Sequence, residues 1–217
     1  MFGWKREDRK GSDADLAQRL SRLESYWRDI RGAALVPARS DIDPVQIDDL
    51  LPDCFIVERV APSVLRLRVA GSRMGEALGM DVRGMPLSAL FLPEGREALA
   101  RHAATAFDGP RIVEFPVRSP GRTGRDALEG RMILLPLADR DGRVTRAMGA
   151  MVWSGEMGTG GGRRFTVPEG PVRNEDPGAP VIAVDGGEQR ARPVMPPADA
   201  GPRPAGASHL RLVIDNT

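Results

Sequence analysis

The stretch Leu65-Arg66-Leu67-Arg68-Val69 alternates strictly between apolar and basic residues. Successive side chains of a β-strand point to opposite faces, so this pattern predicts a half-buried strand whose arginines face the solvent. A second apolar run, residues 55–60, precedes it across Ala61-Pro62-Ser63, a sequence typical of a tight turn. The two runs together predict a β-hairpin.

Helices and further strands follow this hairpin along the chain. Residues 71–90 indicate short helical pieces interrupted by glycine and proline, and a clearer helix is predicted at 94–107. Three more strands are predicted at 111–118, 131–137 and 144–153, and the second of these is apolar on both faces, as a central strand can be. Two groups of strands with helices between them predict an α+β fold with an antiparallel sheet.

An amphipathic helix is predicted at 13–31, ahead of the sheet. Its apolar residues recur at spacings of four, three, four and three, and they form one narrow seam: Leu16, Leu20, Leu23, Trp27 and Ile30. A lone helix of this length is marginal in water, so the seam must be buried. Either the chain's own sheet or the same helix of a second chain can bury it. The heptad-like spacing favours the second chain, and we therefore predict a homodimer through this seam.

The segment 37–52 is interpreted as a structured connector between the helix and the first strand. Asp43 precedes Pro44, a pattern typical of an N-cap followed by the first residue of a short helix. Arg39 and Asp41 stand close by. Charged residues in a tight connector more often brace it locally than form a site, so we assign no chemistry to this group.

Several motifs resemble a PAS-domain family that is common in alphaproteobacteria. The most specific motif is at the start, where Trp27, Pro37-Ala38-Arg39-Ser40-Asp41-Ile42-Asp43-Pro44 and Leu50-Leu51-Pro52 follow in order. Weaker matches continue through Leu67-Arg68-Val69-Ala70-Gly71, Gly79-Met80-Asp81-Val82-Arg83-Gly84, Leu135-Pro136-Leu137 and Met148-Gly149-Ala150. The resemblance runs from about residue 20 to residue 153.

This resemblance implies a five-stranded antiparallel sheet with helices on one face. Together with the helix predicted at 13–31, it leads us to predict a PAS-like domain at 13–153. PAS domains hold small ligands or cofactors between sheet and helices, or serve as dimerisation modules. The family does not settle a ligand, so the resemblance leaves the cofactor unknown.

Composition and charge restrict the possible functions. The net charge is +1 and arginine alternates with acid along the chain, so we expect no binding to nucleic acid or to a membrane surface. No run approaches the roughly 20 apolar residues that span a bilayer. With Cys54 as the only cysteine and no signal-peptide pattern, we expect a cytoplasmic protein. Because no nucleophile–base pair or metal cluster is recognisable, we expect no enzymatic activity.

The two ends of the chain differ from the domain in composition. Residues 1–12 are polar and are expected to be flexible. We predict that 154–217 form a disordered tail, because its glycine- and proline-rich sequence can bury little apolar surface. Only 209–214 has a strand-like pattern. That segment could dock on a sheet edge or add to a partner's sheet, or it is an incidental apolar end.

A ligand pocket of the PAS type would lie between the helix 94–107 and the sheet. Its expected lining combines both elements: Leu67, Val69, Met74, Leu78, Leu99, His102, Val113, Phe115, Leu134 and Met148. In PAS proteins that bind haem, a histidine on the equivalent helix ligates the iron. We nevertheless favour a partly exposed or hydrogen-bonded His102, and we predict no bound metal. Cys54, at the start of a strand, is interpreted as a small buried hydrophobe rather than a flavin-reactive thiol.

Two functions agree with this sequence. The first is a sensory domain that binds a small, mainly apolar molecule and relays the signal to a partner protein. The second is a ligand-free module for protein–protein interaction or dimerisation, whose core is filled by its own side chains.

Overall fold

The computed structural model describes residues 13–158 and 162–178. Helix α1 (Asp13–Arg31) comes first, followed by three short 3₁₀ helices, η1 (Arg39–Asp41), η2 (Pro44–Ile47) and η3 (Leu51–Asp53). The remaining elements are β1 (Cys54–Ala61), β2 (Val64–Ala70), α2 (Ser72–Leu78), η4 (Leu87–Leu90), α3 (Pro93–Asp108), β3 (Ile112–Ser119), β4 (Leu128–Ala138), β5 (Val144–Ser154) and β6 (Arg173–Glu175).

The six strands form one antiparallel sheet in the order β2-β1-β5-β4-β3-β6. Strands β4 and β5 are the longest and pair along almost their whole length, from Glu129 opposite Ser154 to Ala138 opposite Val144. The predicted α+β class and antiparallel sheet are therefore confirmed. Among the strands of the described residues, only short β6, which pairs with β3 at the sheet edge, was not predicted from the sequence.

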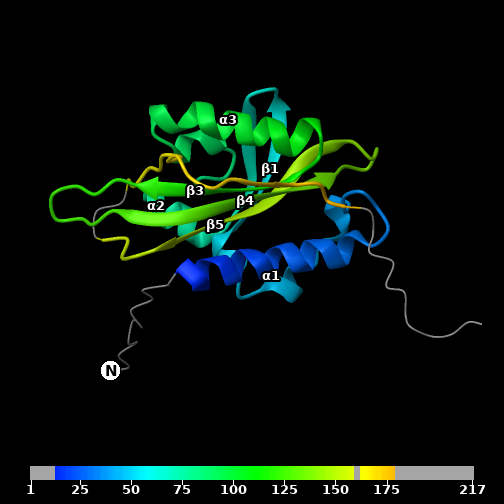
Figure 1. The fold of residues 1–217 in the computed structure, drawn as a ribbon, viewed down its shortest axis with the longest axis horizontal. Coiled ribbons are helices and arrows are strands. Elements are labelled where there is room, and N and C mark those ends of the chain that lie inside the picture. The colour runs from blue at the N-terminus through cyan, green and yellow to red at the C-terminus, as the bar shows by residue number, and fades with distance from the viewer. Residues whose placement is uncertain (1–12, 159–161, 179–217) are drawn as a thin grey trace, which may run out of the picture. The chain divides into compact units, whose positions relative to one another are not determined.

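Helices cover both faces of this sheet, as Figure 1 shows for α3 and α1. On one face, α2 and α3 pack on a core that includes Phe115 and Leu134. On the other face, α1 packs on a second core that includes Ile133 and Leu135. The resemblance implied helices on one face only. The second cover is needed because successive residues of β4 are apolar, so each face of the strand presents hydrophobic surface.

The seam of α1 lies against the chain's own sheet. Leu16, Leu20, Leu23 and Trp27 are buried there, and Ile30 is partly buried beside them. The indole Nε1 of Trp27 donates a hydrogen bond of 2.9 Å to the carbonyl oxygen of Pro136 in β4. The prediction of a dimer interface at this seam is therefore wrong, because the seam is already buried against the chain's own sheet. The periodicity that suggested a coiled coil is shared by any helix with one narrow buried stripe.

The predicted disorder after residue 153 is also wrong for residues 162–178. Phe165 is fully buried in the core under α3, and its backbone N–H donates 2.9 Å to the carbonyl of Leu90. Thr166 exchanges two backbone hydrogen bonds with Arg118 of β3. Two anchoring contacts of this kind can order a segment whose average composition suggests disorder.

Several predictions concern residues outside the described part of the chain. They are the flexible N-terminus at 1–12, the disordered tail from 179 onward, and the strand-like segment 209–214. Among the described helices, none is both long and apolar enough to cross a membrane.

Candidate functional site

Most residues predicted to contact a ligand lie together between α3 and the sheet. Six are buried in the core there, Leu78 packs partly buried against it, and His102 is half-buried on α3. The six are Leu67, Met74, Leu99, Val113, Phe115 and Leu134. The sequence therefore grouped these residues on the correct face, while their role in binding stays a prediction.

This region is filled by the protein's own side chains. The exposed fraction is 0% for Leu67, Met74, Val113 and Leu134, so no water-sized space touches them. Packing of this density is what protein cores normally have. A ligand could enter here only if these side chains moved apart.

His102 lies flat on an aromatic partner at the edge of this core. Its ring stacks on Phe115 of β3, with ring centroids 4.4 Å apart and an interplanar angle of 20°. Burial, and secondarily the charge of Arg101, lower the pKa of His102 below its ordinary value. Its surroundings therefore favour the neutral imidazole. No cluster of three potential metal ligands is found among the described residues.

Val69 and Met148 do not belong to this group, because both face the α1 side of the sheet. In β2, a register shift between Ile56 and Val57 places Val69 opposite Ile56 and Leu67 opposite Val57. Such a bulge reverses the alternation that the sequence pattern assumes. In β5, Met148 pairs with Ile56 and Leu135, and all three contribute to the α1-side core. Placing these two residues in the α3-side site was wrong.

The two misplaced residues instead line a surface groove on the α1 side. This connector groove has a volume of about 530 Å³ and lies between the η2–η3 segment and strands β1 and β2. Its lining is mainly apolar, with a polar rim: Arg39, Ile42, Pro44, Ile47, Asp48, Leu51, Pro52, Cys54, Phe55, Ile56, Val69, Ala70, Gly71, Ser72 and Met148. Burial, and then the charge of Asp53, raise the pKa of the Cys54 thiol to about 12. The thiol is therefore protonated and acts as an apolar wall.

The connector owes its shape to local hydrogen bonds, as its sequence predicted. The Asp43 carboxylate accepts 3.0 Å from the backbone N–H of Val45 and so caps η2. The Asp41 carboxylate accepts 2.9 Å from the backbone N–H of Ala38. These acids brace the backbone that forms one wall of the groove.

Comparison with known proteins places the chain in a family. The family described as PAS domain matches residues 17–152, which is more than half of the chain. The chain belongs to the PAS-domain family. No curated protein matches this PAS domain.

Solved structures similar to this PAS domain are light-oxygen-voltage domains. One, studied with a flavin analogue, is 16% identical with a TM-score of 0.38, and the match covers 51% of this chain and 82% of that one. The Aureochrome1 domain in its light state is 15% identical with a TM-score of 0.37, covering 51% and 87%. The Rhodobacter sphaeroides protein is 16% identical with a TM-score of 0.38, covering 54% and 71%. At these values we draw no conclusion about ligand or activity.

Two glycines of the PAS-like motifs are required by close packing. A Cβ on Gly71 would overlap the backbone carbonyls of Leu51 and Pro52. A Cβ on Gly149 would overlap the ring of Phe55 and the carbonyl oxygen of Ile133. The first contact holds the connector against β2, and the second keeps β5 close to its neighbours in the sheet.

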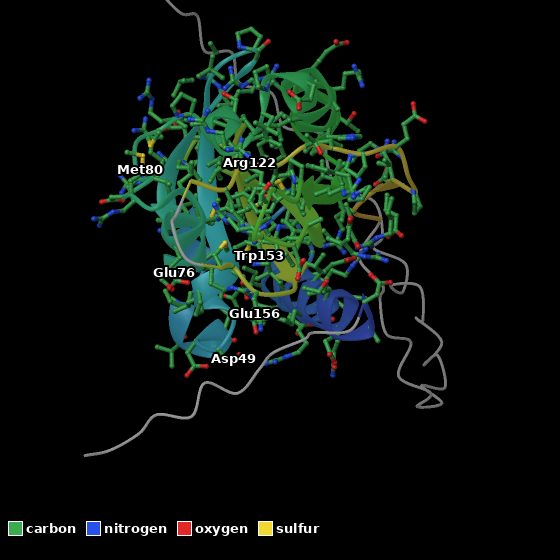
Figure 2. The ribbon with its side chains drawn as sticks, turned by 90° about the vertical axis from the view of Figure 1, so that its left-hand side faces the viewer. Asp49, Glu76, Met80, Arg122, Trp153 and Glu156 are labelled. Carbon is green, nitrogen blue, oxygen red and sulfur yellow. The ribbon has the colours of Figure 1, made fainter. Side chains whose placement is uncertain are left out.

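A buried acid that sequence analysis missed connects the two sides of the PAS domain. Asp53, at the end of η3, is buried and accepts hydrogen bonds from Arg19 of α1 and, at 2.8 Å, from Arg73 of α2. The Arg73 guanidinium in turn lies 4.3 Å from the ring centroid of Trp153, which Figure 2 labels. Nothing in the sequence around Asp53 could have revealed these contacts, because both partners are 20 or more residues away.

Proposed function

We propose that this PAS domain is a non-enzymatic sensory domain that binds a small, mainly apolar molecule in the connector groove and relays the signal to a separate partner protein. The observation that carries this proposal is the groove itself. Its volume of about 530 Å³ falls within the range of about 300–1,000 Å³ usual for small-molecule sites. Apolar walls with a few polar groups at the rim suit such a ligand.

The position of the groove also suits a relay. The η2–η3 wall leads directly to Asp53, whose carboxylate bonds to Arg19 of α1 and Arg73 of α2. A ligand that shifts this wall would therefore change how both helices are held. A change in α1 would present a different surface to a partner, which is one of the usual ways in which binding is coupled to signalling.

Binding of the neutral apolar dye Nile red tests the proposal. The change Val69→Asp puts a charge into the groove, whereas Val60→Asp puts the same charge on β1, outside the groove. Both valines are 45% exposed, so the two variants should fold equally well. We expect Val69→Asp to weaken dye binding at least about tenfold and Val60→Asp to leave it unchanged.

A specific observation supports the second candidate function, a ligand-free interaction module. The space between α3 and the sheet, where PAS domains hold ligands, is filled by the chain's own side chains. If Nile red does not saturate the wild type, or if both variants lose binding equally, the interaction module is the better interpretation. Native mass spectrometry of the purified protein complements this test, because a co-purifying mass supports the sensor.

A further inference from the structure

A second pocket, separate from the connector groove, is lined by arginines. It has a volume of about 200 Å³ and lies between the end of α2, the start of α3, the β3–β4 loop and residues 162–164. Its lining contains four arginines, Arg122, Arg125, Arg163 and Arg164, and no acidic residue. Figure 2 labels Arg122 and Met80, which belong to this lining. We call it the arginine pocket.

Arg163 carries a buried charge that only neutral oxygens contact. The residue is 4% exposed. Its guanidinium donates 2.7 Å to the carbonyl of Met157, 2.8 Å to that of Asp126 and 3.1 Å to that of Glu156. No carboxylate in the described part of the chain pairs with it. Burial and then the charge of Arg125 lower its pKa, against the opposing charge of Asp126.

Arg122 and Arg164 add two exposed side chains at the same pocket. Neither makes a side-chain hydrogen bond or ion pair with any residue that the structure describes. Two other exposed arginines of the domain do pair with acids, Arg83 with Asp81 and Arg101 with Glu97. A guanidinium offers a planar fork of donors that matches the oxygens of a carboxylate or a phosphate.

We propose that the arginine pocket binds a small organic anion through its carboxylate or phosphate group. The anion would pair with the exposed guanidinium groups of Arg122 and Arg164. Leu78, Met80 and Leu92 form an apolar wall that can contact the rest of the ligand. The volume lies below the range of drug-sized sites, so the ligand is small. This site is chemically different from the apolar groove and does not depend on it.

Binding would also join parts of the domain that are distant in sequence. Arg122 and Arg125 belong to the β3–β4 loop, whereas Arg163 and Arg164 directly precede the buried Phe165 in the chain. An anion bridging them would hold this segment against the loop. A ligand that binds only the folded state raises the midpoint of unfolding, and the rise grows with the logarithm of the ligand concentration above Kd.

Titration calorimetry with inorganic phosphate and, separately, with succinate tests the proposal and distinguishes the two anionic groups. The double variant Arg122→Gln/Arg164→Gln removes two exposed cations from the pocket. The control Arg140→Gln/Arg143→Gln removes two exposed cations from the β4–β5 turn, and so has the same net charge. We expect the pocket variant to lose at least about tenfold in affinity for one or both anions, and the control to keep wild-type affinity.

The opposite results would overturn the inference. If neither anion binds the wild type saturably, or if the pocket and control variants lose affinity equally, the arginines only contribute to a diffuse positive surface. Binding of a polyanion such as heparin without binding of either small anion would likewise reject a small-ligand site. Thermal melts of both variants confirm that the chain is folded in each case.

Discussion

Asp53 and His102 show how burial determines the behaviour of single polar residues in this PAS domain. Asp53 is buried but accepts hydrogen bonds from Arg19 and Arg73, so its charge is compensated. His102 stacks on Phe115, and burial lowers its pKa. The acid therefore links two helices, whereas the histidine is favoured in its neutral form.

His102 should make the stability of the domain depend on pH below about 6.5. Its pKa is lowered in the folded state, whereas an exposed histidine titrates near 6.5. Between these two values the unfolded chain binds the proton more readily. The contribution of His102 to the free energy of unfolding is therefore fully present above about pH 6.5, and it is lost as the pH falls through this window. Thermal melts should show a larger fall in Tm from about pH 7.5 to about pH 5.5 for the wild type than for His102→Gln.

Two carboxylates that pair with arginines, Glu24 and Glu58, do not interfere with this measurement. Hydrogen bonds from arginine lower the pKa of Glu24, against the opposing effect of its burial, and also that of Glu58. Both groups therefore titrate below about pH 4.5, outside the window. An equal fall in Tm for wild type and variant would show that another group governs the pH dependence.

At the scale of elements, α1 is a structural part of the domain. Its seam is buried on β4 and β5, and its polar side is held by charges from the C-terminal segment. Arg173 of β6 bonds to Glu24 of α1 and, at 2.9 Å, to Glu114 of β3. Arg31 donates 2.9 Å to the carbonyl of Pro177. Helix α1 is thus fixed by apolar contacts on one side and by ion pairs on the other.

The variant Leu20→Glu should destabilise the domain strongly rather than produce a folded monomer from a dimer. Leu20 is 1% exposed, and an unpaired carboxylate there would cost roughly 3 kcal/mol or more of the free energy of unfolding. Gln18→Glu places the same charge on the exposed side of α1 and should change stability by less than about 0.5 kcal/mol. Urea unfolding measures both. If light scattering shows that Leu20→Glu converts a dimer to a monomer of unchanged stability, the seam is an interface between chains after all.

At the scale of the whole molecule, the domain extends beyond the last strand of the five-stranded core to residue 178. Phe165 is part of the α3-side core. Strand β6 extends the sheet beyond β3, and its Arg173 bonds to Glu24 of α1. The end of the PAS-type sequence at residue 153 is therefore not the end of the folded unit.

Removing residues 157–178 should lower the thermal stability measurably. Burying one phenylalanine contributes about 2–3 kcal/mol, and in a domain of this size that corresponds to a fall in Tm of about 5–10 °C. The comparison is between a chain ending at Gly178 and one ending at Glu156. Within the intact chain, Phe165→Ala should reproduce much of the loss, and Val172→Ala, at a residue that is 44% exposed, should not. Equal melting temperatures for the two chain lengths would show that residues 157–178 do not contribute to the stability of the domain.

The sequence alone determined the type and position of the elements up to Ser154. Helix periodicity located α1 and α3, and apolar runs located five strands, to within about three residues of their observed ends. It also carried the PAS motifs whose glycines allow close packing. These features are local, because each depends on residues within a few positions of one another.

Only the tertiary structure decided which surfaces meet. Both faces of β5 are apolar, so the pattern of apolar and polar residues could not predict that Met148 lies on the α1 side. The bulge that turns Val69 depends on pairing with β1, and the burial of Asp53, Arg163 and Phe165 depends on contacts with distant residues. For the same reason, the sequence allowed the apolar seam of α1 to be buried either by the chain's own sheet or by a second chain, and in the fold the chain's own sheet buries it. Burial is a property of the assembled chain, and periodicity reports only that a surface must be buried, not by what.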